Sequence, residues 1–192
     1  MLALILAIPG YVYYQQRQAE QANELLGRIL PVYEQGNYEQ ALNGNGQQAG
    51  LLTLADDYGG TDAGNLATFY AATALYEQGK YDRALTYYQR FEKNNDFIGA
   101  SAYAAEASIY ENRGDMQTAA ERYEQAAEQY QNKLTAPRYL LEAGKAYEEA
   151  RGFAAAEEGY RRIKQEYPDS DQAEEVDRFL ARVKARRTRS GS

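Results

Sequence analysis

The feature that most constrains this chain is an internal repeat that occurs three times. Gly79 and Gly114 are 35 residues apart, and Ala84, Ala119 and Ala156 follow one another at spacings of 35 and 37 residues. Each copy contains two helix-length segments joined by a turn, and glycine suits that turn because it readily adopts the left-handed conformation that ends a helix. One helix pair cannot bury its apolar side alone, so such pairs stack on their neighbours. The repeat therefore predicts an all-α array of antiparallel helix pairs.

These segments resemble tetratricopeptide repeats, whose period is near 34 residues. The family's small residues at two helix crossings and its aromatic residue on the second helix are matched by Ala72, Ala107, Gly144, Ala84, Ala119, Ala156, Tyr88, Tyr123 and Tyr160. The resemblance implies a right-handed superhelix of helix pairs with a capping helix at its C-terminal end. It also implies that the first helices of the pairs line a concave groove.

The repeat pattern divides the chain into segments. The clear repeats are expected at residues 65–98, 100–133 and 137–170, a capping helix at 171–186 and a disordered basic tail at 187–192. Residues 21–64 are expected to form a degenerate first repeat, since "EQGNYEQA" at 34–41 is nearly identical to "EQGKYDRA" at 77–84. The helix breakers from Asn43 to Gly46 are expected to interrupt its second helix, which resumes at Leu51.

The N-terminal segment is unusually apolar, because residues 1–14 contain no charged side chain. A helix that spans a bilayer needs about 20 such residues. Tyr11, Tyr13 and Tyr14 resemble the aromatic belt found at membrane interfaces. We expect residues 1–20 to be part of a transmembrane anchor that begins before the sequence given. A soluble helix whose apolar end packs on the repeats is the alternative.

Composition excludes several kinds of chemistry. The net charge of −7 disfavours nucleic-acid binding, which requires clustered Lys and Arg. The chain has no Cys and no His, so disulfides, thiolate chemistry and Cys/His zinc sites are excluded. No phosphate loop and no pair of enclosed carboxylates stands out. We therefore expect no catalytic residue, no cofactor and no metal site, and the chain is not expected to be an enzyme.

The resemblance also implies which side chains would face a partner in the groove. By their offset within the repeats they are Tyr33, Leu66, Phe69, Thr73, Tyr76, Glu77, Ser108, Glu111, Asn112, Arg138, Leu141, Lys145 and Glu148. This groove would be aromatic in its N-terminal part and charged in its C-terminal part. A peptide with an apolar anchor and a basic or mixed-charge flank would suit it.

The resulting hypothesis is a non-catalytic scaffold that binds a protein or peptide. By analogy with membrane-anchored tetratricopeptide proteins of the bacterial envelope, we expect an inner-membrane anchor with the repeats in the periplasm. Such a protein would assist a translocon, a chaperone or envelope assembly. The alternatives are a soluble cytosolic adaptor and a module that self-associates into a homo-oligomer.

Overall fold

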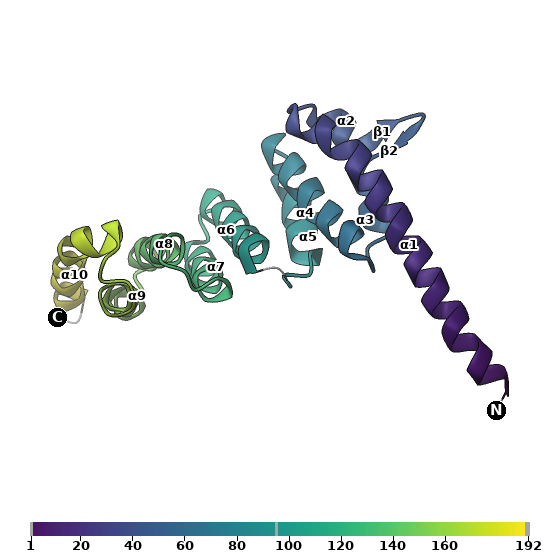
Figure 1. Cartoon of the computed structure of the whole chain (residues 1–192). Coiled ribbons are helices and arrows are strands. Elements are labelled where there is room, and N and C mark those ends of the chain that lie inside the picture. Colours follow the sequence, from purple (N-terminus) through teal and green to yellow (C-terminus); the bar gives the residue numbers. More distant parts are fainter. Residues whose placement is uncertain (1, 95, 191–192) are drawn as a thin grey trace. The chain divides into compact units, whose positions relative to one another are not determined.

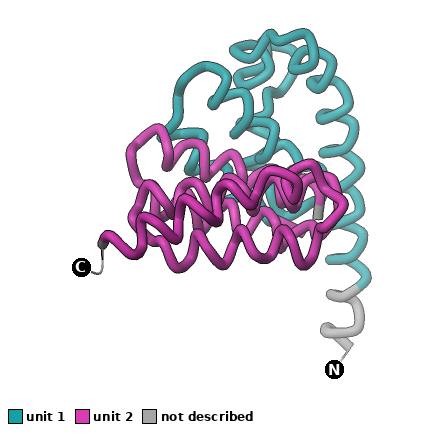
Figure 2. Tube along the Cα trace, turned by 90° about the vertical axis from the view of Figure 1, so that its left-hand side faces the viewer, with its two compact units in different colours: residues 1–92 teal, residues 93–192 magenta. Residues whose placement is uncertain are grey.

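The computed structural model describes residues 2–94 and 96–190 and shows an all-α protein with one small hairpin (Figure 1). Its contacts divide the chain into unit 1, residues 1–92, and unit 2, residues 93–192 (Figure 2). The right-handed superhelix expected for the whole array stays a prediction.

Unit 1 begins with one long helix, followed by shorter elements. In chain order the elements are α1 (Leu2–Glu34), α2 (Tyr38–Asn43), β1 (Gly44–Asn45), β2 (Gln48–Ala49), α3 (Leu51–Asp57), α4 (Asp62–Glu77) and α5 (Tyr81–Arg90). Helices α4 and α5 form the helix pair of the first clear repeat. The core of this unit includes Ala22, Leu26 and Ile29 on α1, which are buried at spacings of four and three residues. That spacing makes one apolar face on the second half of α1.

The hairpin lies where the sequence contains its cluster of helix breakers. Helix α2 ends at Asn43, strands β1 and β2 pair antiparallel, and α3 starts at Leu51. Gly44 has φ +72°, and a Cβ atom there would lie 2.0 Å from the carbonyl oxygen of Gln48. Only glycine fits this position, so the sequence itself prevents α2 and α3 from joining into one helix.

Residues 11–14 of α1 differ from its second half because their large side chains are exposed. Tyr11, Val12, Tyr13 and Tyr14 are 64%, 47%, 63% and 58% exposed. No helix in the described residues combines the length and the apolar character that crossing a bilayer requires. Nor does a helix boundary occur near residue 20, since α1 runs without a break from Leu2 to Glu34. The transmembrane anchor is therefore not supported by the described helices.

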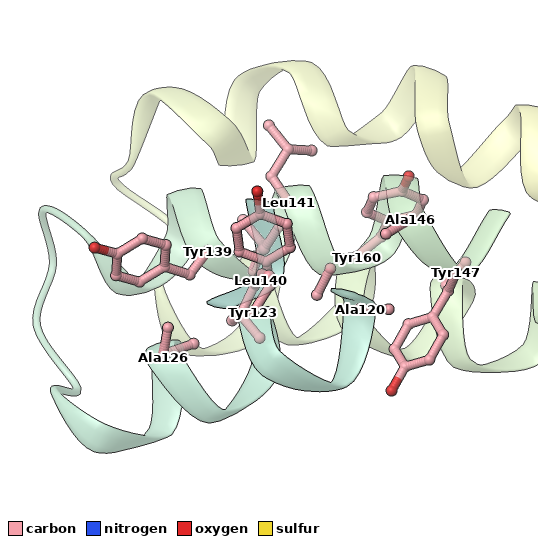
Figure 3. Packing of buried hydrophobic residues seen from close by; sticks show 14 of the residues in the cluster. Ala120, Tyr123, Ala126, Tyr139, Leu140, Leu141, Ala146, Tyr147 and Tyr160 are labelled. Carbon is pink, nitrogen blue, oxygen red and sulfur yellow. The ribbon is translucent and has the colours of Figure 1, made fainter. Parts of the chain in front are cut away.

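Unit 2 contains two further helix pairs and a terminal helix. They are α6 (Asp96–Asn112), α7 (Met116–Gln129), α8 (Ala136–Glu149), α9 (Phe153–Glu166) and α10 (Asp171–Ser190). Each helix packs on the next one in the chain. Its core combines many alanines with the large side chains of Tyr123, Leu140, Tyr147 and Tyr160, which Figure 3 shows between the helices. Alanine lets the helix backbones approach closely, and the tyrosine rings fill the space that remains.

Gly144 shows how closely the helices of this unit approach. A Cβ atom at Gly144 would lie 2.3 Å from the ring of Tyr160, which is itself fully buried. The small residue is required because the α9 tyrosine lies directly against the backbone of α8. The family resemblance places small residues at this position, and the ring contact is the physical reason for one here.

The turn inside each repeat uses the left-handed conformation. Gly79 and Gly114 have φ +71° and +79°. In the third repeat Arg151 takes this role with φ +61°, and Gly152 instead precedes α9 with φ −79°. An L-residue pays about 1 kcal/mol or more for this conformation, so the third turn is less favourable than the other two.

The terminal helix is longer than expected. Helix α10 continues to Ser190, so residues 187–190 are helical where a disordered tail was expected. Residues 191–192 lie outside the described residues. Val176, Phe179 and Val183 are buried at spacings of three and four residues, which gives α10 one apolar side. This side packs on α8 and α9, as a terminal capping helix should.

Candidate functional site

The predicted partner-facing residues of unit 1 form a stripe along α4. Leu66, Phe69, Thr73 and Tyr76 are separated by three, four and three residues, so they share one side of the helix. All four are half-buried, and Glu77 at the end of the helix is exposed. A half-buried stripe of this kind has apolar area that its own unit does not fully cover.

Aromatic rings support this stripe from the neighbouring helices. Tyr33 of α1 packs edge-on against Tyr70, with ring centroids 4.9 Å apart. Phe69 packs against Tyr88 and Phe91, with ring centroids 6.0 and 5.5 Å away. The stripe is therefore held in place by a rigid aromatic cluster that joins α1, α4 and α5.

Hydrogen bonds at Thr73 orient the two tyrosines of this cluster. The hydroxyl of Tyr88 donates to Thr73 Oγ1 at 3.1 Å, and Tyr33 also hydrogen-bonds to Thr73. Burial, with a smaller effect from the neighbouring Tyr38, raises the pKa of Tyr33 to about 12. Burial likewise raises the pKa of Tyr88 well above its ordinary value. Both hydroxyls stay protonated at neutral pH and can act as hydrogen-bond donors.

In the second repeat the predicted residues gather around the equivalent tyrosine. The hydroxyl of Tyr123 on α7 donates to Glu111 Oε2 at 2.8 Å and also hydrogen-bonds to Ser108. Burial raises the pKa of Tyr123, and the Glu111 carboxylate raises it further. Ser108 and Glu111 are half-buried, while Asn112 is exposed beside them. The three predicted residues of α6 therefore lie at one place, which the sequence alone left open.

In the third repeat three of the four predicted residues lie beside α10. Leu141 is buried and points toward the pale-yellow helix α10 in Figure 3. The Lys145 ammonium lies 5.8 Å from the ring centroid of Phe179, and Glu148 is ion-paired to Arg182. Leu141 and Glu148 do not line the open groove that was expected, because the chain's own terminal helix covers them, whereas Lys145 is half-buried.

Arg138 is separate from that group. Its guanidinium lies over the ring of Tyr139 in the first turn of α8 and is exposed to solvent. The structure therefore does not bring Arg138 to Glu148, which lies near the other end of the same helix.

Glu148 is the most strongly bound carboxylate of this region, with only 2% of its side chain exposed. Its Oε1 accepts from Tyr160 Oη at 2.8 Å and from Arg182 Nη2 at 2.7 Å, and its Oε2 accepts from Arg182 Nε at 3.0 Å. Arg186 lies 3.3 Å away. Burial opposes ionisation, but the hydrogen bonds from Arg182 and Tyr160 outweigh it and hold the pKa of Glu148 below its ordinary value.

Sequence reasoning missed a second buried carboxylate, Glu106 on α6, which is 1% exposed. It lies 3.0 Å from Lys93 Nζ and 3.2 Å from Arg122 Nε. The sequence contains a signal for this burial, because Glu106 stands four residues after Ala102 and three before Ile109 and so shares one side of the helix with these apolar residues. Both neighbours are buried in the structure. A buried charge needs compensating partners, so this group links α6 to α7 and to the start of the unit.

The groups assembled here are aromatic rings, hydroxyls and paired carboxylates. Rings with fixed hydrogen-bonding groups suit recognition of another protein, where Tyr and Arg are enriched. Within the described residues, no group of three or more Asp, Glu, His or Cys side chains could hold a metal ion.

Comparison with known proteins gives one family. A model of the tetratricopeptide repeat matches residues 54–97, 69–134 and 104–171. These matches are continuous from residue 54 to residue 171 and include all three helix pairs found in the structure. No curated protein matches the chain.

Proposed function

Because the chain belongs to the tetratricopeptide repeat family, we propose that it is a non-catalytic scaffold that binds a protein or peptide partner. One observation carries the proposal: the predicted partner-facing residues on α4 form a half-buried stripe of Leu66, Phe69, Thr73 and Tyr76 on a rigid aromatic support. A preorganised aromatic surface loses little side-chain entropy when a partner binds. Such surfaces supply the anchors that dominate protein interfaces.

The test replaces Tyr76 with alanine in the full chain. Tyr76 packs edge-on against Tyr81 and is half-buried, so its loss should leave the helices intact. Photo-crosslinking at Thr73 would first identify the partner, and its affinity for each variant would then be measured. We expect Tyr76→Ala to weaken binding about fivefold or more, since a central aromatic anchor contributes about 1 kcal/mol or more.

The matched control is Tyr87→Ala, which removes another half-buried tyrosine of unit 1 away from the stripe. Both variants should keep the helical circular dichroism signal. Equal affinity of the Tyr76→Ala variant and the unchanged chain would refute the assignment of the stripe.

Membrane tethering through α1 is a further part of the proposal. The exposed residues Tyr11, Val12, Tyr13 and Tyr14 follow one another, and successive residues are 100° apart around a helix, so they cover all its sides. A single protein partner would require one apolar side, whereas lipid favours apolar residues all round. Location in the bacterial periplasm rests only on the analogy with envelope tetratricopeptide proteins.

Flotation of the full chain with phospholipid vesicles tests the tether. Replacing Tyr11, Val12, Tyr13 and Tyr14 with glutamine should move the protein from the vesicle fraction to the soluble fraction. A chain that never floats would favour the soluble adaptor. Size-exclusion chromatography with light scattering, at several protein concentrations, would detect the self-associating alternative.

A further inference from the structure

The second and third repeats share a tyrosine–glutamate pair. Tyr123 donates to Glu111 in the second repeat, and Tyr160 donates to Glu148 in the third, both at 2.8 Å. The members of the two pairs are 37 residues apart in each case. In both, the tyrosine of the second helix fixes a carboxylate on a predicted partner-facing position of the first helix.

The third repeat shows what this arrangement binds, because its carboxylate is already occupied. Arg182 of α10 approaches Glu148 with two nitrogens, Nη2 on Oε1 at 2.7 Å and Nε on Oε2 at 3.0 Å. The same guanidinium lies 4.7 Å from the ring centroid of Phe179, which stacks on Tyr160 at 5.3 Å. A carboxylate and an aromatic ring thus hold one arginine, and this planar fork is the geometry in which arginine exceeds lysine.

The second repeat has the same carboxylate without the arginine, and Glu142 stands 37 residues before Phe179, where the third repeat has its ring. Lys145 of α8 precedes Arg182 by the same 37 residues, but its ammonium pairs with Glu142 at 2.9 Å. No Lys or Arg forms an ion pair with Glu111 in residues 2–94 and 96–190. Glu111 is half-buried, so solvent still reaches it, and its Oε1 accepts no hydrogen bond within the described residues.

The charge around this position also favours a cation. Residues 93–170 of unit 2 contain ten Lys and Arg against fourteen Asp and Glu. Glu142 acts on Tyr123 electrostatically, which places a second carboxylate, ion-paired to Lys145, near the pair. An approaching basic segment would therefore be attracted before it makes direct contact.

We propose that Glu111, with Tyr123 beside it, binds an arginine side chain from a basic segment of a partner protein through its carboxylate, as the Glu148 carboxylate binds Arg182. The proposal rests on the proposed scaffold function and names the chemistry of its partner. The guanidinium binds the free oxygen of Glu111, while the Tyr123 hydroxyl, which also hydrogen-bonds to Ser108, keeps the carboxylate in place. Asn112, exposed next to it, offers the neighbouring peptide backbone a hydrogen-bonding amide.

The experiment uses a synthetic peptide that copies residues 178–187, Arg-Phe-Leu-Ala-Arg-Val-Lys-Ala-Arg-Arg, and a twin in which every arginine is citrulline. Citrulline has the same planar shape without the charge. Each peptide is titrated into the isotope-labelled full chain, and amide signals are followed by NMR. We expect the arginine peptide to shift the signals of Ser108, Glu111 and Asn112 saturably. The citrulline peptide should bind at least tenfold more weakly.

Two variants complete the test. Glu111→Gln keeps the shape of the side chain and should lower the affinity for the arginine peptide by tenfold or more. Glu158→Gln removes the same charge from an exposed position on α9 and should change nothing. Thermal unfolding checks that both variants are folded.

The proposal is overturned if Glu111→Gln binds the peptide as well as the unchanged chain. Signal shifts confined to Glu148 and α10 would also overturn it, because they would mean that the peptide only replaces α10. Neither result would affect the α4 stripe, whose Tyr76 test is independent, so failure here is distinguishable from failure of the scaffold function.

Discussion

At the scale of single residues, tyrosine has two uses in this chain. Its ring fills the space that small residues leave between helices, as Tyr160 does against Gly144. Its hydroxyl reaches the edge of the same contact and donates to Thr73, Glu111 or Glu148 on the first helix of the repeat. Ring packing and a polar contact are therefore coupled, because one side chain supplies both.

Glu148 gives a pH-dependent prediction. We expect Glu148→Gln to lower the free energy of unfolding by about 2 kcal/mol at pH 7, the usual range for hydrogen bonds to a charged group. Because the folded carboxyl has a lowered pKa, its contribution is complete above the ordinary value of 4.5 and is lost as the pH falls through the lowered value. The stability difference between the two proteins should therefore close below about pH 4.5.

Urea unfolding between pH 7 and pH 3.5 measures that difference. Glu149→Gln is the control, since Glu149 is exposed and its loss should cost less than about 0.5 kcal/mol. A difference that stays constant over the whole pH range would contradict the ion pair as its origin.

At the scale of elements, turns and the terminal helix decide how each repeat begins and ends. Gly114 and Arg151 occupy equivalent left-handed positions, yet only one is glycine. Helix α10 covers the third repeat with an apolar side and with arginines that pair with Glu148 and Glu157. The conformation of each turn depends on the backbone freedom of one residue. The packing of α10 on the third repeat depends instead on contacts between helices.

The turns give a pair of opposite predictions. Gly114→Ala should lower the free energy of unfolding by about 1 kcal/mol, because alanine is strained at φ +79°. Arg151→Gly should leave it unchanged or raise it by up to about 1 kcal/mol, since strain is relieved while the unfolded chain gains freedom. Thermal unfolding of both variants would show the contrast, and a stability loss in both would mean that the Arg151 side chain contributes more than its backbone costs.

For α10 the expected weak point is Phe179, which is 6% exposed and stacks on Tyr160. Phe179→Ala should cost about 3 kcal/mol, in the range for a large ring removed from a core. Amide hydrogen exchange should then speed up in α10 more than in α6 and α7. Leu180→Ala, at a half-buried neighbour, should have a smaller effect, and equal effects of the two changes would argue against the stacking contact.

At the scale of the whole molecule, the chain consists of two units that each contain their own buried residues. The hydrophobic cluster of unit 2 extends from Ala100 to Val183 and lies within that unit. In repeat proteins stability is nearly a sum of local terms, since each repeat contacts only its neighbours.

This organisation predicts that residues 93–192 fold as a separate polypeptide. We expect a helical circular dichroism spectrum and a cooperative thermal transition, because the cluster and its covering helix α10 are both retained. Residues 93–170 are the matched comparison, since they lack α10 and should melt at a lower temperature. A non-cooperative melt of residues 93–192 would show that unit 2 depends on the rest of the chain.

The sequence alone determined the repeat, the family and the positions of the turns, because helix periodicity and glycine turns are local properties of the chain. The helix break after Asn43 could also be predicted from the sequence. So could the recurring aromatic position on the second helix of each repeat, at Tyr88, Tyr123 and Tyr160. Only the tertiary structure decided that α10 covers Leu141 and Glu148, that Glu106 is buried, and that Ser108 and Glu111 meet at Tyr123. Ion pairs such as Glu148 with Arg182 join residues 34 positions apart, so they follow from how helices pack rather than from any local pattern.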